Sequence, residues 1–342
     1  MDNKIIYISP SSFYYWNRCP LRALYSKKYK NKQIFPKNPD SDIGTLIHKL
    51  YTKNNVNDKD SFNKIWEQEI RKINGVYLTD ILQARFYPIQ WYSKYYVVKK
   101  QLLYKYINNK KYREGSKASS NNSNISLLYE KWINNDHIGG CVDLLIKQND
   151  EVREIIDFKT GNIFEIKNNK REIRTAYKYQ LALYCAVISE HQNYTPDLFI
   201  ETLDGVRHQI YVDQSYINDL ASKAIELKKK INFVVESGNI ASLAQCNSEN
   251  CKNCNYRVFC KSYKSNLINT NLGGAIDISG VILAKTNTEI QFDTGLAIFT
   301  IKNIKILESL SVGDKTSIYN LYYPDNEQKI LYTLNNTIIY ND

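Results

Sequence analysis

Two neighbouring segments of the sequence, 139–143 and 155–161, each carry a carboxylate beside apolar residues. Asp157 and Lys159 are two residues apart, so on a β-strand both side chains project from the same face. Asp143 can supply a second carboxylate from the adjacent strand. Hydrolysis of a phosphodiester with a divalent metal needs such hard oxygen ligands, and a cation near the attacking water or the developing negative charge. The pattern fits that chemistry, although an Asp-x-Lys triplet by itself is more typical of a solvated strand end.

Two helix-like segments bring further polar side chains to this candidate site. His48 lies in the segment 42–51, and a neutral imidazole can complete a metal site. Gln180 and Tyr184 are four residues apart, which puts both on one face of a helix, where they can hold a phosphate or orient the lysine. A lone histidine on an apolar helix is more often core packing. The significance of these residues therefore rests on their combination with the carboxylates.

In the order of its motifs the sequence resembles the RecB-like branch of the PD-(D/E)XK nucleases, over most of residues 8–263. The matching segments, in order, are Ser11-Ser12-Phe13 with Cys19-Pro20, Gly44-Thr45-Leu46-Ile47-His48, Glu130, Gly140-Cys141-Val142-Asp143, Asp157-Phe158-Lys159-Thr160-Gly161 and Tyr177-Lys178-Tyr179-Gln180-Leu181-Ala182-Leu183-Tyr184. Each segment alone is a weak signal, and their ordered agreement makes the resemblance specific.

The resemblance implies an α/β fold like that of restriction endonucleases, with a metal-dependent active site. The implied ligands of Mg²⁺ or Mn²⁺ are His48, Asp143, Asp157 and the backbone carbonyl of Phe158. Lys159 would be the catalytic lysine, positioning or activating water, while Gln180 and Tyr184 would line the site near the DNA. Glu130 matches an acidic position whose role in the relatives is less defined. No matched active-site position is lost, so the resemblance implies a working enzyme.

Seven cysteines in a chain with no recognisable export signal are expected as thiols or metal ligands rather than as disulfides. Cys251, Cys254 and Cys260 follow one another closely in a polar, loop-like stretch. Three clustered thiolates require a fourth ligand, and soft sulfur ligation suits zinc or an iron–sulfur cluster. Cys141 and Cys185 stand singly in apolar surroundings and are expected as small core residues.

The resemblance favours iron and sulfur at this site. In relatives that carry a 4Fe-4S cluster, including AddB-type proteins and CRISPR-associated RecB-like nucleases, one cysteine precedes the nuclease core and three follow it. The resemblance therefore implies a 4Fe-4S cluster held by Cys19, Cys251, Cys254 and Cys260. Cys246 leaves an alternative open, because with the three later cysteines it can form a local four-thiolate zinc knuckle and leave Cys19 buried.

Hydrophobic periodicity predicts a helical first third of the chain, with Pro20 interrupting the first helix. The helices are expected at 11–30, 42–51, 62–73, 78–112, 174–189 and 214–237. The strands are expected at 125–133, 137–147, 151–158, 197–203 and 208–212. A polar low-complexity stretch, 115–124, is expected to form a mobile loop. The pattern predicts a mixed sheet flanked by helices.

Beyond about residue 269 short strands alternate with turns, which predicts a small all-β domain with a faint OB-like pattern. We therefore expect a nuclease domain at 1–268, closed by the cysteine cluster, and a β-barrel-like domain at 269–342. OB-like domains often bind nucleic acid, but packing or partner docking is an equally good interpretation of this domain.

The 46 Lys and Arg residues outnumber the 35 Asp and Glu residues, and a net charge of +11 favours polyanionic partners, nucleic acid first. The alternative is that the charge serves only solubility. A basic segment beside the proposed site can neutralise phosphates without reading sequence, or can be a solvated loop. Its cationic residues are Lys167, Lys170, Arg171 and Arg174.

Apolar runs are too short to span a membrane and no export signal is recognisable, so we expect a cytoplasmic protein without a membrane partner. The first functional hypothesis is a divalent-metal-dependent deoxyribonuclease, an exonuclease acting on DNA ends or single strands in repair, recombination or defence. The alternative is a DNA-end-binding or scaffold subunit of a helicase–nuclease or defence complex. The sequence has no Walker A segment, so any helicase would be a separate chain.

Overall fold

The computed structural model describes residues 4–30, 32–51, 58–105, 125–324 and 328–340. The chain forms two compact units. Unit 1 comprises Met1–Arg18 and Pro39–Gly238, and unit 2 comprises Cys19–Asn38 and Asn239–Asp342. The expected domain boundary between residues 268 and 269 concerns a different division of the chain and stays a prediction. In the described part of the chain, no helix has the length and apolar character that crossing a membrane requires.

Unit 1 is built on a five-stranded sheet with the order β1-β2-β3-β6-β7. Its strands are β1 (Ile125–Asn134), β2 (Gly139–Gln148), β3 (Glu151–Lys159), β6 (Asp197–Thr202) and β7 (Arg207–Ile210). The β3–β6 pair is parallel and the other pairs are antiparallel, which confirms the predicted mixed sheet. The parallel pair needs a crossover, and the helix between these two strands supplies it.

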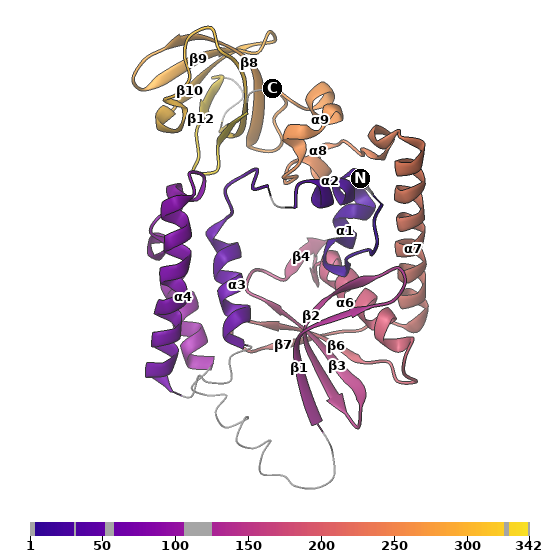
Figure 1. Ribbon diagram of the computed structural model, residues 1–342. Coiled ribbons are helices and arrows are strands. Elements are labelled where there is room, and N and C mark those ends of the chain that lie inside the picture. Colours follow the sequence, from indigo (N-terminus) through magenta and orange to yellow (C-terminus); the bar gives the residue numbers. More distant parts are fainter. Residues whose placement is uncertain (1–3, 31, 52–57, 106–124, 325–327, 341–342) are drawn as a thin grey trace. The chain divides into compact units, whose positions relative to one another are not determined.

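Three helices cover one side of this sheet: α1 (Pro10–Arg18), α6 (Thr175–Ser189) and α7 (Gln214–Ser237) (Figure 1). Helix α6 contacts β1, β2, β3 and β6 and is buried from Gln180 to Ile188, so it is a core helix. Helix α7 has the predicted bounds. The Asp213 side chain accepts the Tyr216 N–H at 2.7 Å at its start, and left-handed Gly238 ends it.

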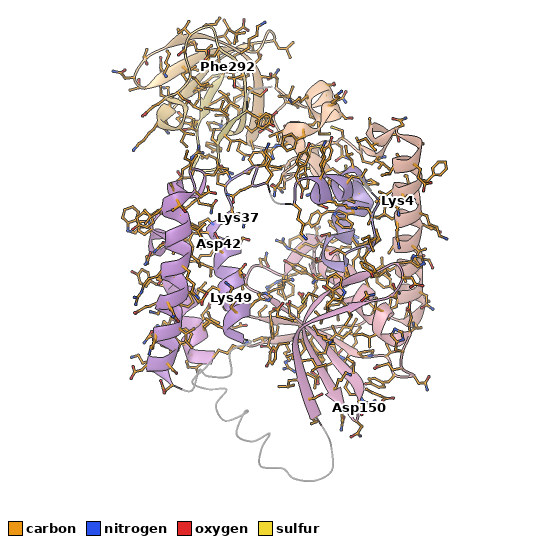
Figure 2. The ribbon with its side chains drawn as sticks, in the orientation of Figure 1. Lys4, Lys37, Asp42, Lys49, Asp150 and Phe292 are labelled. Atoms are coloured by element: carbon orange, nitrogen blue, oxygen red, sulfur yellow. The ribbon has the colours of Figure 1, made fainter. Side chains whose placement is uncertain are left out.

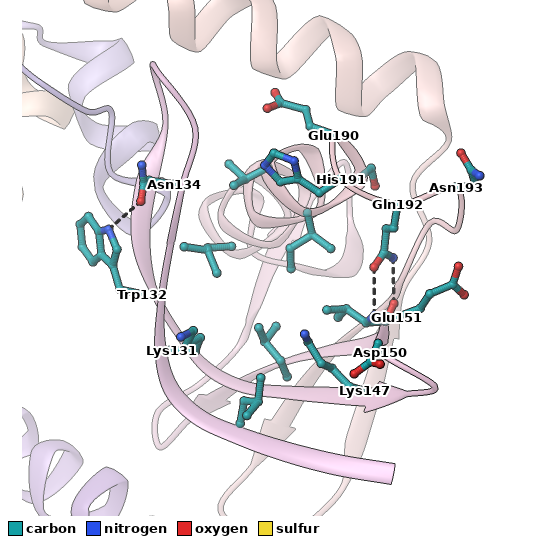
Figure 3. Close-up of a pocket in the computed structure, with 17 residues that line it drawn as sticks. Lys131, Trp132, Asn134, Lys147, Asp150, Glu151, Glu190, His191, Gln192 and Asn193 are labelled. Carbon is teal, nitrogen blue, oxygen red and sulfur yellow. Dashed lines mark hydrogen bonds between the residues drawn. The ribbon is translucent and has the colours of Figure 1, made fainter. Parts of the chain in front are cut away.

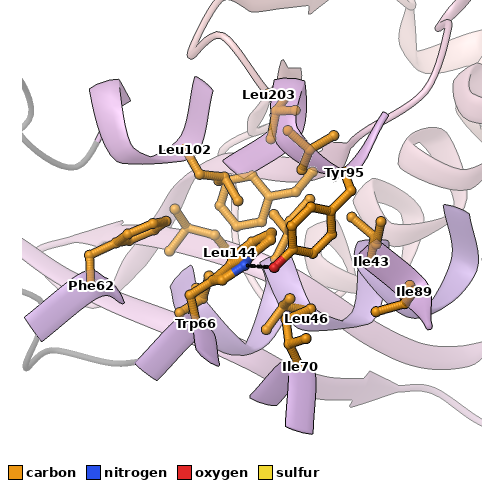
Figure 4. Packing of buried hydrophobic residues seen from close by; sticks show 14 of the residues in the cluster. Ile43, Leu46, Phe62, Trp66, Ile70, Ile89, Tyr95, Leu102, Leu144 and Leu203 are labelled. Carbon is orange, nitrogen blue, oxygen red and sulfur yellow. Dashed lines mark hydrogen bonds between the residues drawn. The ribbon is translucent and has the colours of Figure 1, made fainter. Parts of the chain in front are cut away.

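The other side of the sheet is covered by α3 (Pro39–Tyr51), α4 (Lys59–Thr79) and the helical residues 95–105. These helices pack on Leu144, Ile156 and Phe158 of the sheet in one hydrophobic core (Figure 4). Trp66 of α4 is fully buried there, and its indole N–H donates to the Tyr95 hydroxyl at 2.7 Å. This core holds α3, and the histidine that α3 carries, against the sheet.

The helix predicted at 78–112 is wrong in its first part. Helix α4 ends at Thr79, and the carboxylate of Asp80 accepts the N–H groups of Leu82 and Gln83 at 2.8 and 3.0 Å, a turn that competes with continued helix. Two 3₁₀ turns follow, η1 (Gln83–Phe86) and η2 (Ile89–Trp91). Pro88 between them has no N–H for a helical ladder. The predicted loop at 115–124 lies outside the described residues.

A short hairpin was missed by the sequence reading. The basic stretch after β3 forms β4 (Phe164–Lys167) and β5 (Lys170–Ile173), a separate two-stranded sheet. Asn168 and Asn169 make its turn with φ values of 50° and 60°, the left-handed conformations that a two-residue hairpin loop favours. The signal was present as an Asn-Asn pair between short alternating segments.

Unit 2 contains the predicted all-β region, a six-stranded sheet with the order β12-β10-β9-β8-β11-β13. Its strands are β8 (Ala275–Lys285), β9 (Glu289–Asp293), β10 (Ile298–Lys302), β11 (Lys315–Tyr322), β12 (Ile330–Tyr332) and β13 (Ile338–Tyr340), with η5 (Ile304–Leu307) between them. Phe292, labelled in Figure 2, is fully buried in its core. The likeness to an OB fold stays a prediction.

The rest of unit 2 consists of short helices: α2 (Leu21–Lys28), η3 (Ile240–Leu243), α8 (Ser248–Cys251), η4 (Arg257–Phe259) and α9 (Lys261–Asn266). They join the sheet through a buried ion pair between Arg257 and Asp277 of β8, with Nε and Oδ2 at 2.5 Å. Tyr263 donates its hydroxyl hydrogen to the same carboxylate at 2.7 Å. This pair fixes the cysteine-rich stretch to the sheet.

We expect Trp66→Ala to lower the free energy of unfolding of unit 1 by about 3–5 kcal/mol, because it empties the core under α3. Trp91→Ala is the matched control, since Trp91 is 82 % exposed, and should change stability by no more than about 0.5 kcal/mol. All four tryptophans lie in unit 1, so urea unfolding followed by tryptophan fluorescence reports on this unit. Equal effects of the two changes would contradict the packing described.

Candidate functional site

Three side chains from three elements of unit 1 meet in one group. His48 comes from α3, Glu130 from β1 and Asp143 from β2, and one ligand atom from each lies within 4.8 Å of the others. His48 Nδ1 is 3.3 Å from Glu130 Oε1 and 3.4 Å from Asp143 Oδ1. An imidazole and two carboxylates at these separations can hold a divalent ion.

Backbone geometry explains how Glu130 comes into this group. The pairing of β1 with β2 runs from Tyr129↔Leu144 to Lys131↔Val142, which puts Glu130 opposite Asp143. Glu130 has a φ of 48°, an uncommon value for a residue other than glycine. Two facing carboxylates repel each other, so a cation near them is favourable. Burial lowers the pKa of His48, but Asp143 and then Glu130 outweigh it and leave that pKa raised.

A second group is formed by Asp157 and Lys159 at the end of β3. Asp157 is 2 % exposed, and its Oδ1 accepts the side-chain N–H of Gln180 at 2.7 Å. Its Oδ2 lies 2.6 Å from the Lys159 ammonium. Burial raises the pKa of Asp157, against the opposing effect of Lys159. Burial lowers the pKa of Lys159, but the charge of Asp157 more than offsets it, so that the lysine keeps its proton.

Asp143 connects the two groups. The pairing of β2 with β3 ends at Leu144↔Ile156, and beyond this point the Asp143 carboxylate accepts the Phe158 N–H at 2.7 Å. The side chain thereby replaces a backbone carbonyl where the strands part. One carboxylate oxygen faces β3 while the other faces His48. The predicted Phe158 carbonyl ligand is not tested by these contacts and stays a prediction.

The family model for the PD-(D/E)XK nuclease superfamily matches residues 7–261. The chain belongs to this superfamily. A crystal structure of a candidate exonuclease from Eubacterium rectale is similar to it at 13 % sequence identity and a TM-score of 0.41, over 68 % of this chain and 82 % of that chain. No curated protein matches the chain.

Membership of the PD-(D/E)XK superfamily implies a hydrolase that acts on nucleic acids, and the matched residues include both groups of the site. The structure brings His48, Asp143 and Glu130 together, while Asp157 contacts Lys159 and Gln180 instead. The sequence named all of these residues as candidates, but it gave Glu130 no defined role. Its position across from Asp143 is a pairing register, which a single sequence does not reveal.

Tyr184 packs against the backbone of β2 beside the candidate site. It is 2 % exposed, and its hydroxyl donates to the Cys141 carbonyl at 2.6 Å. Gly140 makes room for it, because a Cβ at this position would lie 3.1 Å from the Tyr184 ring and 3.0 Å from Cδ of Pro10. The glycine of the matched motif therefore permits close approach of α6 and α1 to β2.

The interpretation of Cys141 as a core residue is wrong. Its side chain is exposed, and Sγ lies 3.5 Å from Oε2 of Glu130. Burial and then Glu130 raise the pKa of the Cys141 thiol to about 11. Apolar neighbours in the sequence misled the assignment, because they alternate with residues that face the acidic group. Cys185 is buried as predicted.

The predicted basic residues lie on or beside the β4–β5 hairpin and are exposed: Lys167, Lys170, Arg171 and Arg174. Arg171 stacks over the Phe164 ring with its guanidinium carbon 3.9 Å from the ring centre. Arg174 donates to the Phe164 carbonyl at 3.3 Å. The two arginines thus stiffen the hairpin, and a phosphate contact by any of the four stays a prediction.

A separate groove lies on the sheet, and its lining includes none of His48, Glu130 and Asp143 (Figure 3). Its floor is apolar, with Leu145 and Val187 buried, and its rim is polar. Gln192 closes one end, where its side chain accepts the Val152 N–H and donates to the Val152 carbonyl, both at 2.9 Å. The Gln192 side chain thus supplies β3 with backbone-like hydrogen bonds at Val152, which does not pair with β6.

Unit 2 gathers five cysteines around one small cavity: Cys19, Cys246, Cys251, Cys254 and Cys260. Cys246 Sγ lies 3.6 Å from Cys251 Sγ, and Cys19 Sγ accepts the Gln245 N–H at 3.5 Å. Burial raises the pKa of the Cys254 thiol, with Arg22 opposing it. The thiols of residues far apart in the sequence thus share one enclosure, which suits soft ligation.

We expect Gly140→Ala to destabilise unit 1 by about 1–3 kcal/mol, because the added methyl group overlaps Tyr184 and Pro10. Gly75→Ala is the matched control: it lies in α4 with no heavy atom within 4 Å of the new methyl group, and should stabilise by roughly 0.5–1 kcal/mol. Urea unfolding of both variants measures the difference. A neutral Gly140→Ala would contradict the close approach of α6.

Proposed function

We propose that the chain is a divalent-metal-dependent deoxyribonuclease that hydrolyses phosphodiester bonds at DNA ends or in single strands. The observation that carries this proposal is the contiguity of the His48–Glu130–Asp143 group with the Asp157–Lys159 pair through the Asp143 carboxylate. Hard donors beside a positioned ammonium are what metal-assisted phosphodiester hydrolysis requires.

The proposed ligands of Mg²⁺ or Mn²⁺ are His48, Asp143, Asp157 and the Phe158 carbonyl, to which we add Glu130 from the observed grouping. The donors fit such an ion, because all are oxygen or imidazole nitrogen. When bound, the ion would polarise the scissile phosphate and lower the pKa of water. Gln180 orients the Asp157 carboxylate by donating to Oδ1, so the site is largely preformed.

Lys159 is proposed as the catalytic lysine. Its side chain is 21 % exposed, so the ammonium is mostly shielded yet reachable by substrate. Asp157 holds it by charge and by a 2.6 Å contact, and Tyr177 lies beneath it with its ring centre 5.0 Å from Nζ. A cation fixed in this way can position water or stabilise the negative charge that develops on the phosphate.

We further propose that DNA lies along the exposed basic hairpin of residues 164–173, where its cations meet phosphates without reading sequence. The net charge of +11 supports a polyanionic substrate. Work in repair, recombination or defence, beside a helicase on a separate chain, follows from the resemblance to the RecB-like branch. A cytoplasmic site of action is proposed with this role, because cysteines that serve as metal ligands rather than disulfides are typical of a reducing compartment.

At the cysteine cavity we propose a 4Fe-4S cluster held by Cys19, Cys251, Cys254 and Cys260, with zinc as the alternative. A tetrahedral zinc site would draw its thiolates to within about 4 Å of one another. Among the described residues no three cysteine sulfurs approach within 4.8 Å of one another. A cluster whose ligands bind separate irons accommodates thiols that stand farther apart.

We expect Asp157→Ala and Lys159→Ala to lower the rate of Mn²⁺-supported cleavage of end-labelled DNA on the order of 10³-fold, which corresponds to several kcal/mol of transition-state stabilisation. DNA affinity should persist, because the hairpin is untouched. Single-stranded and duplex, linear and circular substrates belong in the same assay, since resistance of circles alone identifies an exonuclease.

Asp219→Ala and Lys223→Ala are matched controls, because these residues form an exposed ion pair on α7 at 2.6 Å and should leave cleavage unchanged. Cleavage that survives both active-site changes would refute the mechanism. If the wild type binds DNA but cuts no substrate, the chain is instead an end-binding or scaffold subunit.

We expect anaerobically purified protein to be brown and to contain iron and sulfide, with the colour lost in Cys254→Ser. Cys185→Ser is the control, because this buried thiol lies in unit 1. Elemental analysis and visible absorption make the measurement. A colourless protein with stoichiometric zinc would replace the iron–sulfur proposal by the zinc alternative.

A further inference from the structure

A group of aromatic rings lies on the surface of unit 2, where segments far apart in the sequence meet. The ring of Tyr29, which follows α2, stacks on the Phe259 ring of η4 with centroids 4.1 Å apart and planes inclined by 21°. The Tyr340 ring of β13 meets Phe259 edge-on, with centroids 5.4 Å apart. All three residues are partly exposed. The rings therefore form one continuous patch that reaches solvent.

Lysine side chains lie over these rings. The Lys28 ammonium is 5.3 Å from the centre of the Tyr29 ring. The Lys32 ammonium lies over two rings, 5.2 Å from the centre of Phe259 and 6.0 Å from that of Tyr340. With Lys264, whose ammonium is also 6.0 Å from the Tyr340 ring centre, these residues make up the aromatic–lysine surface of unit 2.

The two stretches of sequence that supply most of this surface hold most of the net charge of the chain. Residues 19–38 contain six Lys and Arg, residues 250–276 contain four, and neither stretch contains Asp or Glu. Together they carry ten of the +11 net charges. Among these cations Arg257 is buried and paired with Asp277 of β8. The partner that this concentration of charge favours is a polyanion.

Rings and cations together suit a single strand of nucleic acid better than a duplex. The bases of a duplex stack on one another, whereas a single strand has base faces that stack on aromatic side chains while its phosphates follow a basic surface. Stacking of a base is stronger than an exposed cation–π contact. A base can therefore displace an ammonium group from a ring, and the ammonium then meets a neighbouring phosphate.

We propose that the aromatic–lysine surface of unit 2 binds single-stranded DNA, with bases on its rings and phosphates on Lys28, Lys32 and Lys264. This site is separate from the β4–β5 hairpin, which belongs to unit 1. The choice of DNA as the nucleic acid rests on the proposed function, whereas the binding of a single strand requires no cleavage.

The test measures the affinity of the full chain, purified anaerobically, for fluorescently labelled DNA by anisotropy at several salt concentrations and without added divalent ion. The probes are a thymidine strand of about 20 nucleotides, which exceeds the roughly 4–16 nucleotides that one small barrel covers, a hairpin duplex with as many phosphates, and a uridine RNA strand of equal length. One variant combines Lys28→Gln with Lys32→Gln, and the other is Tyr29→Leu, which keeps an apolar side chain but removes the ring.

Each variant has a matched control in unit 2. Lys305→Gln with Lys315→Gln removes the same charge from two exposed lysines of η5 and β11, elements that contribute nothing to the surface. Tyr322→Leu removes an exposed ring of β11. Circular dichroism checks that every protein is folded. The double lysine change affects only exposed side chains, so it tests the proposal even where Tyr29→Leu does not fold.

We expect the double lysine variant to bind the DNA strand at least about tenfold more weakly, and its slope of log affinity against log salt to become shallower by about 1.4, or about 0.7 for each lost phosphate contact. Tyr29→Leu should weaken binding of the strand at least about fivefold and leave the duplex and the salt slope unchanged. Both controls should bind as the wild type does.

A double lysine variant with the affinity and the salt slope of the wild type would refute the surface. Binding of the duplex as tightly as the strand, or an equal effect of Tyr29→Leu on both, would contradict the stacking of bases. Tighter binding of the RNA strand would overturn the choice of DNA. If the expected effects appear but wild type cleaves no DNA with Mn²⁺, the nuclease function fails and the single-strand site stands.

Discussion

The Asp143 carboxylate, which accepts the Phe158 N–H where β2 and β3 part, is the contact on which the site depends. A buried N–H at the point where two strands separate needs a hydrogen-bond acceptor, and leaving it without one costs on the order of 1–3 kcal/mol of stability. Because one carboxylate oxygen meets this need, the other is held facing His48. The hydrogen bond that the sheet needs at this point thus also positions Asp143 as a candidate metal ligand. The site therefore depends on how the strands β2 and β3 end.

Burial of charge is the second constraint. Asp157 is 2 % exposed, and an isolated carboxylate in such surroundings would be strongly disfavoured. Lys159 and Gln180 take one oxygen each, which compensates the lost water. Buried ion pairs seldom add much stability over apolar residues of the same shape. Their presence here is better explained by the need for charges held in fixed positions.

The sequence predicts the parts of unit 1 whose pattern is local. Alternating apolar residues mark β1 to β3, and Asp213 with Gly238 marks the ends of α7. The helix predicted at 78–112 is wrong in its first part, because a side-chain turn at Asp80 overrides helix propensity there, while residues 95–105 are helical. The approach of Glu130 to Asp143 was not predicted, since it depends on the pairing register of β1 with β2.

The cysteines show why residue type alone does not assign a metal. In unit 2 the thiols line a cavity with few competing donors, so softness alone suits them to iron or zinc. Cys141 instead contacts Glu130, at the edge of a group of one imidazole and two carboxylates that suits hard ions. Donors of this kind bind Zn²⁺ more tightly than Mn²⁺, so affinity alone does not select Mn²⁺ over Zn²⁺. Coordination number and ion supply must therefore decide which ion the group holds.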